Sequence, residues 1–336
     1  MGTSLSTAFT DGTSSDAIQS FFDKLLLVRG TYDLIHTIPM VKKSLAQRNG
    51  KTMIWRRYDT LALATTTLTE GTNPAARAKT KTDVSATIAL YGDYIEDTDF
   101  LVNTQPEAVA TENVELQGQQ MGETFDQIAR DRYATATNIV YANGTSTVTV
   151  SQILDRNDLD RIYRLVRVNK AKTFSPAMMA SQVEGTGSVM PSYWGLADER
   201  VAFDLRHVDG FVSCADYGNY GKKVVGEIGS DKNGIRFLCS PNGYYLAGAS
   251  GTTIAATDVK NTSSYADIYS LFVVGMNAVA SVNLEGSNGG VIRHGFGTSG
   301  VADALDLRQT TGWKKYYVDV VLNQAFFGEL QCAVSL

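Results

Sequence analysis

Few of the residue types that carry chemistry occur in this chain at the spacing that a reaction or a bound cofactor requires. Gly50, Lys51 and Thr52 match the end of a phosphate-binding loop, in which backbone amides and a lysine hold phosphate groups. However, Leu45 stands where that loop needs its first glycine, and the residues after Thr52 alternate like a strand instead of starting a helix. Residues 248–251 (GASG) do not have the spacing of a nucleophile elbow. We therefore expect neither a nucleotide site nor a serine nucleophile.

Metal-ligating and acidic residues are equally dispersed. The three histidines lie far apart, without the close spacing of zinc ligands, and we expect each to be structural: His36, His207 and His294. Asp97 and Asp99 resemble a carboxylate pair, but they precede a predicted helix, whose amino-terminal dipole favours acidic residues. The cysteines are odd in number and widely spaced, which argues against a disulfide framework: Cys214, Cys239 and Cys332. We expect no catalytic residue, no metal and no cofactor, and therefore a protein that is not an enzyme.

The composition excludes further classes of protein. The chain has 336 residues, of which 30 are basic and 35 acidic, and its net charge of −5 does not fit a polybasic nucleic-acid-binding protein. Hydrophobic residues make up 43%, which is enough for a sizeable core, and no apolar run is long enough to span a bilayer. Residues 1–16 lack the apolar core of a signal peptide and suggest a flexible arm. We expect folding in a reducing cytoplasm.

One long helix is predicted to organise the chain, over residues 104–144. Thr104 and Glu107 have the spacing of a capping box, and a glycine at 144 suits a helix end. The helix would contain about 38 residues and extend about 57 Å. Asp126 and Arg130 are predicted to pair at i, i+4. One mostly apolar face recurs at alternating spacings of four and three, and consists of Val114, Gly118, Met121, Phe125, Ile128, Arg132, Thr135 and Ile139.

Residues 51–91 are predicted to form a long two-stranded hairpin, because the hydrophobic period changes there from about 3.6 to 2. Its tip is poor in large apolar residues, and such a hairpin is marginal alone in water, so it needs a neighbouring domain or subunit. Arg77, Lys79 and Lys81 fall at i, i+2 and i+4 of the return strand. They form either a solvated strand face or a basic strip that docks on an acidic patch of an adjacent copy. We predict these three residues, with Glu70 at the tip, to be inter-subunit contacts.

The remaining elements are shorter. Residues 15–30 are predicted to form an amphipathic helix that buries itself on a neighbour, with Phe21, Phe22 and Leu25 as further inter-subunit contacts. A weak helix, broken at Pro39, is predicted over residues 32–47, and a firmer one over 158–171. Residues 181–188 suggest a linker. Strands are predicted at 148–150, 211–213, 223–225, 235–238, 271–274, 315–323 and near Leu330, with a hairpin turn at 231–234.

In this order, the elements resemble the tailed-bacteriophage major capsid protein, which has the Hong Kong ninety-seven fold. Several local motifs are similar to those of the N-four-like, podovirus-type group. They are NGKT at 49–52 with RRYDTL at 56–61, LTEGTNP at 68–74, LYG at 90–92 with Thr98-Asp99, GEIG at 226–229 with GIRF at 234–237, and TGWK at 311–314. The resemblance covers most of residues 45–330, with weaker agreement over 190–215 and 240–270.

The resemblance implies an α+β fold with five parts. They are an N-arm at 1–48, an E-loop hairpin at 49–92, a spine helix and peripheral domain at 93–188, an axial domain at 189–300, and terminal strands at 301–336 that return to the peripheral domain. It implies a structural protein of the virion that assembles in the host cytoplasm. Pentamers and hexamers would form an icosahedral shell that encloses double-stranded DNA without sequence-specific binding.

Partners follow from the same resemblance. We expect a portal protein at one vertex, a possible decoration protein and no membrane. We also expect a separate scaffolding protein, because the chain shows no long helical scaffolding segment at its amino terminus. Two alternatives are weighed against this interpretation. An encapsulin-type bacterial compartment shares the fold and would have a cargo enzyme among its genomic neighbours, in place of terminase and portal genes. A β-rich enzyme or carbohydrate-binding module would leave the long hairpin unexplained.

Overall fold

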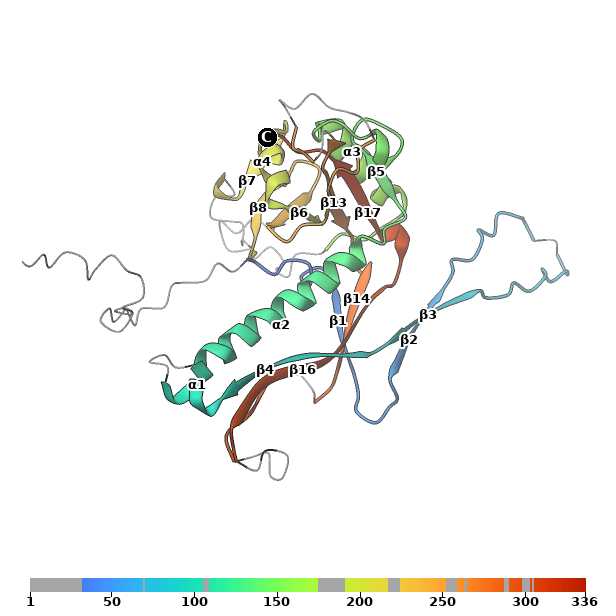
Figure 1. Cartoon of the computed structure of the whole chain (residues 1–336). Helices are drawn as coiled ribbons and strands as arrows, with labels where there is room; N and C mark the ends of the chain where they lie inside the picture. The colour runs from blue at the N-terminus through green and yellow to red at the C-terminus, as the bar shows by residue number, and fades with distance from the viewer. Residues whose placement is uncertain are drawn as a thin grey trace, which may run out of the picture.

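The computed structural model describes most of the chain after the first 31 residues. The described residues are 32–68, 70–104, 109–174, 191–216, 224–251, 259–262, 265–286, 290–297, 303 and 305–336. The predicted amphipathic helix at 15–30, with Phe21, Phe22 and Leu25, and the linker at 181–188 lie outside this part of the chain. Two sheets dominate the rest, one long and open, the other inside a rounded body, and a long helix runs between them (Figure 1).

The open sheet has five strands and is built around one long strand, β16 (Arg308–Val321). Its partners are β14 (Val279–Leu284), β15 (Gly290–His294) and β4 (Ala89–Thr98), all antiparallel to it. The edge strand β1 (Val41–Leu45) runs parallel to β14. The sequence predicted the long alternating strand, but its prediction of a helix over residues 32–47 is wrong. Pairing of five residues with β14 outweighs a weak local preference for helix.

The long helix α2 (Val109–Tyr133) is shorter than predicted. A separate helix, α1 (Asp99–Thr104), precedes it, so Thr104 ends a helix instead of capping one. Residues 139–141 form a strand, β5 (Ile139–Tyr141), which pairs in parallel with residues 329–331. The predicted continuation to Gly144 is therefore wrong, because a short β-branched stretch found a partner strand far away in the sequence. The turn signal itself was read correctly, since Asn143 and Gly144 both have positive φ.

The second sheet has eight strands and collects distant segments of the chain. Its order is β5, β17 (Phe327–Cys332), β13 (Ile268–Val274), β6 (Tyr193–Asp198), β9 (Ile235–Ser240), β8 (Glu227–Asp231) and β7 (Phe211–Ser213), and β10 (Tyr245–Leu246) also pairs with β13. Every residue of β13 and β17 is buried, as expected for strands covered on both faces. The hairpin turn between β8 and β9 is confirmed. Val224 and Val225 were predicted to lie in a strand, but they form none and come just before β8.

Each face of this sheet carries its own core. On one face pack α3 (Arg156–Val168) and α4 (Glu199–His207), through buried side chains that include Leu159, Ile162 and Val201. On the other face lie the last turns of α2, through Ala129 and Tyr133, together with Ile35. The α3 prediction is confirmed, and Asp155 caps it as the first turn requires. Residues 147–149 form a 3₁₀ turn, η1 (Thr147–Thr149), where an extended segment was predicted.

Helix α2 therefore touches both sheets and fixes one against the other. At mid-helix, the Phe125 ring lies 4.6 Å from that of Tyr317 and 5.7 Å from that of Trp313, both on β16. Near its end, the Tyr133 ring lies 5.9 Å from that of Phe272 on β13. Aromatic pairs at these distances add to the stabilisation that comes from burial. The helix thus acts as the spine that the sequence predicted, over 25 residues.

Candidate assembly surfaces

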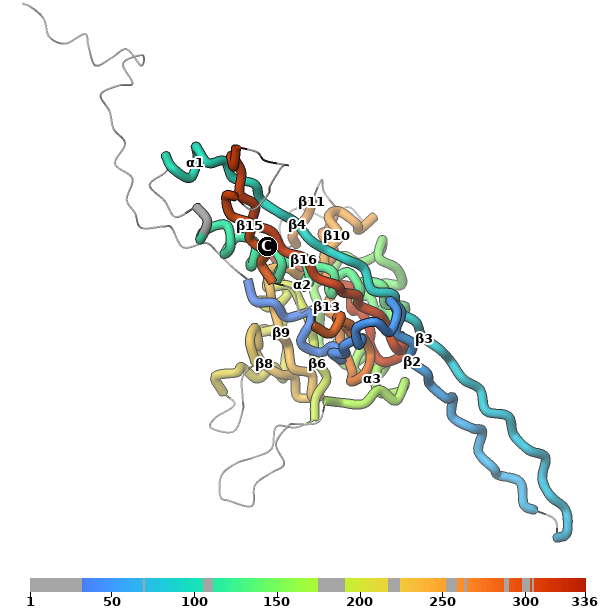
Figure 2. Tube along the Cα trace, turned by 90° about the horizontal axis from the view of Figure 1, so that it is seen from below, coloured from blue at the N-terminus to red at the C-terminus, as the bar shows by residue number. Residues whose placement is uncertain are grey.

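The hairpin formed by β2 (Thr52–Tyr58) and β3 (Lys81–Thr87) projects away from the rest of the molecule (Figure 2). Seven residue pairs join the two strands, from Thr52 with Thr87 to Tyr58 with Lys81. Beyond them, every described residue from 59 to 80 is exposed. Several large apolar side chains of the hairpin face solvent: Ile54 (62% exposed), Tyr58 (61%), Leu61 (52%), Leu63 (83%) and Leu68 (73%). Exposed apolar surface is a frequent feature of interaction sites, so this hairpin is a candidate assembly surface.

The basic residues of the hairpin do not share one strand face. The return strand begins only at Lys81, so Arg77 and Lys79 lie in the irregular segment before it. Arg77 donates a hydrogen bond to the carbonyl of Ala62 across the hairpin. The Lys81 ammonium lies 4.0 Å from Asp83, whose carboxylate also binds Arg56 at 2.8 Å. All three predicted basic residues are exposed, as is Glu70, and their role in contacts between subunits stays a prediction.

Behind the hairpin, the first described residues of the chain are anchored on the body of the molecule. The Asp126 carboxylate on α2 accepts hydrogen bonds from the His36 backbone N–H at 2.9 Å and from Nδ1 of the His36 ring at 2.7 Å. It also accepts one from the Asn242 amide at 3.0 Å, and Asn242 in turn accepts one from Arg130 at 2.9 Å. His36 and Asp126 are almost completely buried. This cluster anchors the first described residues of the chain to α2.

The predicted pairing of Asp126 with Arg130 is replaced by this cluster. Asp126 points into the body toward His36, while Arg130 binds Asp131 at 2.8 Å and Asn242. Asp126 lies outside the apolar face that the sequence predicted, so local spacing gave no signal of its burial. A buried carboxylate must find a buried partner. That partner lies ninety residues away and could not be named from local spacing.

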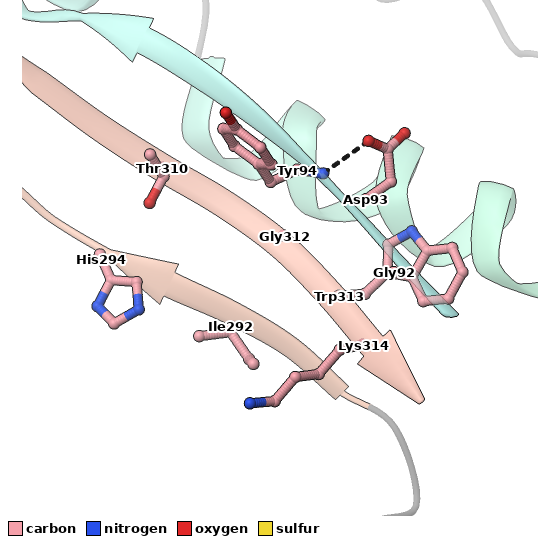
Figure 3. A pocket seen from close by; sticks show the side chains of 9 residues that line it. All are labelled: Gly92, Asp93, Tyr94, Ile292, His294, Thr310, Gly312, Trp313 and Lys314. Carbon is pink, nitrogen blue, oxygen red and sulfur yellow. Dashed lines mark hydrogen bonds between the residues drawn. The ribbon is translucent and has the colours of Figure 1, made fainter. Parts of the chain in front are cut away.

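The face of the five-stranded sheet opposite α2 is open and holds a shallow groove (Figure 3). Two glycines form its floor. In the pairing of β4 with β16, Gly92 lies opposite Lys314, and Gly312 lies opposite Tyr94. A Cβ at either glycine would come within 3 Å of the neighbouring strand, at 2.6 Å from the Trp313 carbonyl oxygen for Gly92 and 2.8 Å from the Tyr94 Cβ for Gly312. Ile292 and His294 of β15 border the groove.

Several of the residues that could do chemistry have structural roles within the fold. His207 bonds the Phe203 carbonyl at 2.8 Å, within its own helix. Burial raises the pKa of the Cys239 and Cys332 thiols well above the ordinary value, which keeps them protonated and unreactive. Asp97 is buried in β4 and accepts a hydrogen bond from Asn113, and Asp99 starts α1, a helix that the sequence did not predict. Within the described ranges, no cluster of three or more histidine, cysteine or acidic residues could hold a metal.

No helix in the described part of the chain is both long and apolar enough to cross a membrane. A comparison with protein-family models finds no match, and neither does a search of curated proteins. Solved structures do match, over nearly the whole chain. Those described next are phage capsids, and their sequences are only distantly similar to this one.

Three of these structures show the extent of the likeness. The capsid of Ralstonia phage GP4 aligns with a TM-score of 0.66 at 11% identity, covering 99% of this chain and 98% of that one. The cyanophage Pam1 capsid gives a TM-score of 0.61 at 13% identity, with 97% and 99% covered. The capsid structure of cyanophage P-SCSP1u gives 0.61 at 14% identity, with 95% and 94% covered. The chain therefore has the α+β Hong Kong ninety-seven fold of tailed-phage major capsid proteins, as its sequence predicted.

Proposed function

We propose that this protein is the major capsid protein of a tailed bacteriophage, a structural subunit that assembles with copies of itself into the shell of the virion. The observation that carries the proposal is the projecting hairpin. The described residues between 59 and 80 are all exposed, and their own chain supports them through cross-hairpin bonds such as that from the Asp59 N–H to the Thr80 carbonyl, at 3.0 Å. The full-length likeness to capsid structures supports the same conclusion.

In the proposed shell, each hairpin lies over an adjacent copy. The contact joins two different surfaces, hairpin on one side and body on the other, so repetition by rotation closes rings such as pentamers and hexamers. Exposed leucines at the tip would supply the apolar part of the contact. Glu70 and the three basic residues would supply the charged part. Interfaces of this wrapped kind exceed the ~1,600 Å² of a standard protein contact.

Finer features of the proposal come from the sequence resemblance. They are membership of the N-four-like group, the division into N-arm, E-loop, peripheral and axial domains, and partnership with scaffolding, portal and decoration proteins. The DNA would be enclosed without sequence-specific contacts, which suits a chain with a net charge of −5. An encapsulin-type compartment is not favoured, because the matching structures are phage capsids.

Charge reversal tests the role of the hairpin. The variant carries Arg77→Glu, Lys79→Glu and Lys81→Glu, and the chain is expressed together with the genes that neighbour its own. We expect the yield of sedimenting particles to fall strongly, while the melting temperature of the free subunit changes little, because exposed substitutions usually cost less than about 0.5 kcal/mol.

A matched variant controls for the change in net charge. It carries Arg164→Glu and Arg167→Glu on the exposed side of α3 and Lys170→Glu in the turn after it, and it should assemble normally. Equal losses of assembly and of melting temperature in the hairpin variant, or equal loss of assembly in both variants, would count against docking through the hairpin.

A further inference from the structure

The end of α2 meets the five-stranded sheet at a buried acidic residue, Asp319. It lies on β16 opposite Ser281 of β14, and its side chain is almost completely buried. Tyr317, two residues earlier on the same face of the strand, packs on Phe125 of α2. β16 ends two residues after Asp319, and the chain then crosses to β17 in the other sheet. Asp319 therefore lies near the end of β16, where the chain leaves the five-stranded sheet for the sheet that the last turns of α2 also contact.

This junction gathers buried polar atoms that no described group satisfies. Among the described residues, Tyr317 of the same strand is the hydrogen-bonding neighbour of the Asp319 carboxylate, and no residue of α2 donates a hydrogen bond to it. The Nε–H of Arg132 and the hydroxyl of Tyr133, both in the last turn of α2, are buried without partners, as is the amide oxygen of Asn283 on β14. A buried polar group without a partner destabilises the arrangement that buries it. Such a cluster is a place where two conformations can have similar free energies.

Charged and titratable groups face Asp319 from every element around it. Arg132 and Tyr133 come from α2, Lys315 and Tyr317 from β16, and Lys42 from the edge strand β1 lies near Lys315. Burial raises the pKa of Asp319 to about 7, although Tyr317, Arg132 and Lys315 each act in the opposite direction. Burial also lowers the pKa of Lys315, whose ammonium lies 4.6 Å from the Phe125 ring centre.

We propose that Asp319 is a proton-controlled contact between the end of α2 and the five-stranded sheet, which holds while the carboxyl group is protonated and loosens when it ionises. A carboxylate buried with so few donors is costly, so ionisation favours an arrangement in which water reaches it. Loosening at this point would free the two sheets to shift relative to each other. The inference concerns the single subunit and does not depend on the proposed function.

Hydrogen–deuterium exchange of the full chain tests the proposal across pH 5.5 to 8.5, with rates corrected for intrinsic exchange. In the natural chain, peptides that cover residues 128–136 and 315–321 should exchange severalfold faster at high pH, with a midpoint of about 7. Asp319→Asn should remove this dependence. Arg132→Gln, which removes a cation that favours ionisation, should raise the midpoint by about one pH unit, a tenfold change in proton affinity.

Asp131→Asn is the matched control, because this neighbouring acid is 52% exposed. It should leave the exchange profile unchanged. Exchange that is independent of pH in the natural chain would overturn the proposal. So would a pH dependence that survives in Asp319→Asn, or one that is lost in Asp131→Asn. If Asp319→Asn does not fold, the midpoint in Arg132→Gln decides, and an unchanged or lower midpoint contradicts the proposal.

Discussion

Replacing Asp126 with asparagine should destabilise the subunit far more than any change at an exposed acid of the same helix. The carboxylate accepts three hydrogen bonds of 2.7, 2.9 and 3.0 Å, two from His36 and one from Asn242. Both His36 and Asp126 are nearly inaccessible to water. An asparagine keeps one acceptor but presents an N–H₂ group to donors, which leaves buried groups unpaired. Partial loss of such a charged cluster costs about 3 kcal/mol.

The assay is urea denaturation of unassembled subunits, followed by tryptophan fluorescence. Asp131→Asn serves as the control, since its side chain is 52% exposed and such changes usually stay within about 0.5 kcal/mol. A double-mutant cycle with His36→Gln isolates the pair, and we expect a coupling free energy of about 1–3 kcal/mol. Equal effects of Asp126→Asn and Asp131→Asn, or strict additivity with His36→Gln, would refute the role assigned to this cluster.

Two further predictions concern stability. The Asp319 pKa of about 7 lies above its ordinary value of 3.8, so the folded chain keeps a proton that the unfolded chain releases, and the free energy of unfolding should fall as the pH rises from about 4 to 7. Between pH 4 and pH 8, the free energy of unfolding of Asp319→Asn should rise by up to about 4 kcal/mol relative to that of the natural chain, measured by denaturation at each pH. A difference in unfolding free energy that stays constant with pH would contradict this. Gly118→Ala should stabilise the subunit by about 0.5–1 kcal/mol, because a Cβ at this position of α2 meets open space. Gly229→Ala should destabilise the subunit, because its Cβ would lie 2.4 Å from the Phe211 ring. Thermal melts that rank the two variants in the reverse order would disprove this account of packing.

The strands and helices that local sequence patterns mark strongly could be predicted. Alternation along 315–323 identified the end of β16, and the pattern around Val84 and Ala86 identified β3. Helix α3 was found from its apolar spacing. The failures lie where a distant strand decides the outcome. β1 and β5 are short, their own residues express no strong preference, and each forms only by parallel pairing with a segment nearly two hundred or more residues away.

The candidate surfaces were predicted in outline and not in geometry. A hairpin poor in self-contacts follows from its composition, but the positions of Arg77 and Lys79 depend on where β3 starts, which the alternating pattern did not fix. The buried pair of His36 and Asp126, and the buried Asp319, depend on contacts across the fold. Spacing along the chain does not reveal such contacts. A charged residue within an apolar helix face or strand does indicate that it has a buried partner elsewhere in the fold.

Electron cryo-microscopy of the chain, expressed together with its neighbouring genes, tests the central claim most directly. The account predicts closed shells in which density for residues 59–80 crosses onto an adjacent subunit. Particles that remain single subunits at every concentration, or shells in which this segment folds back on its own chain, would contradict it.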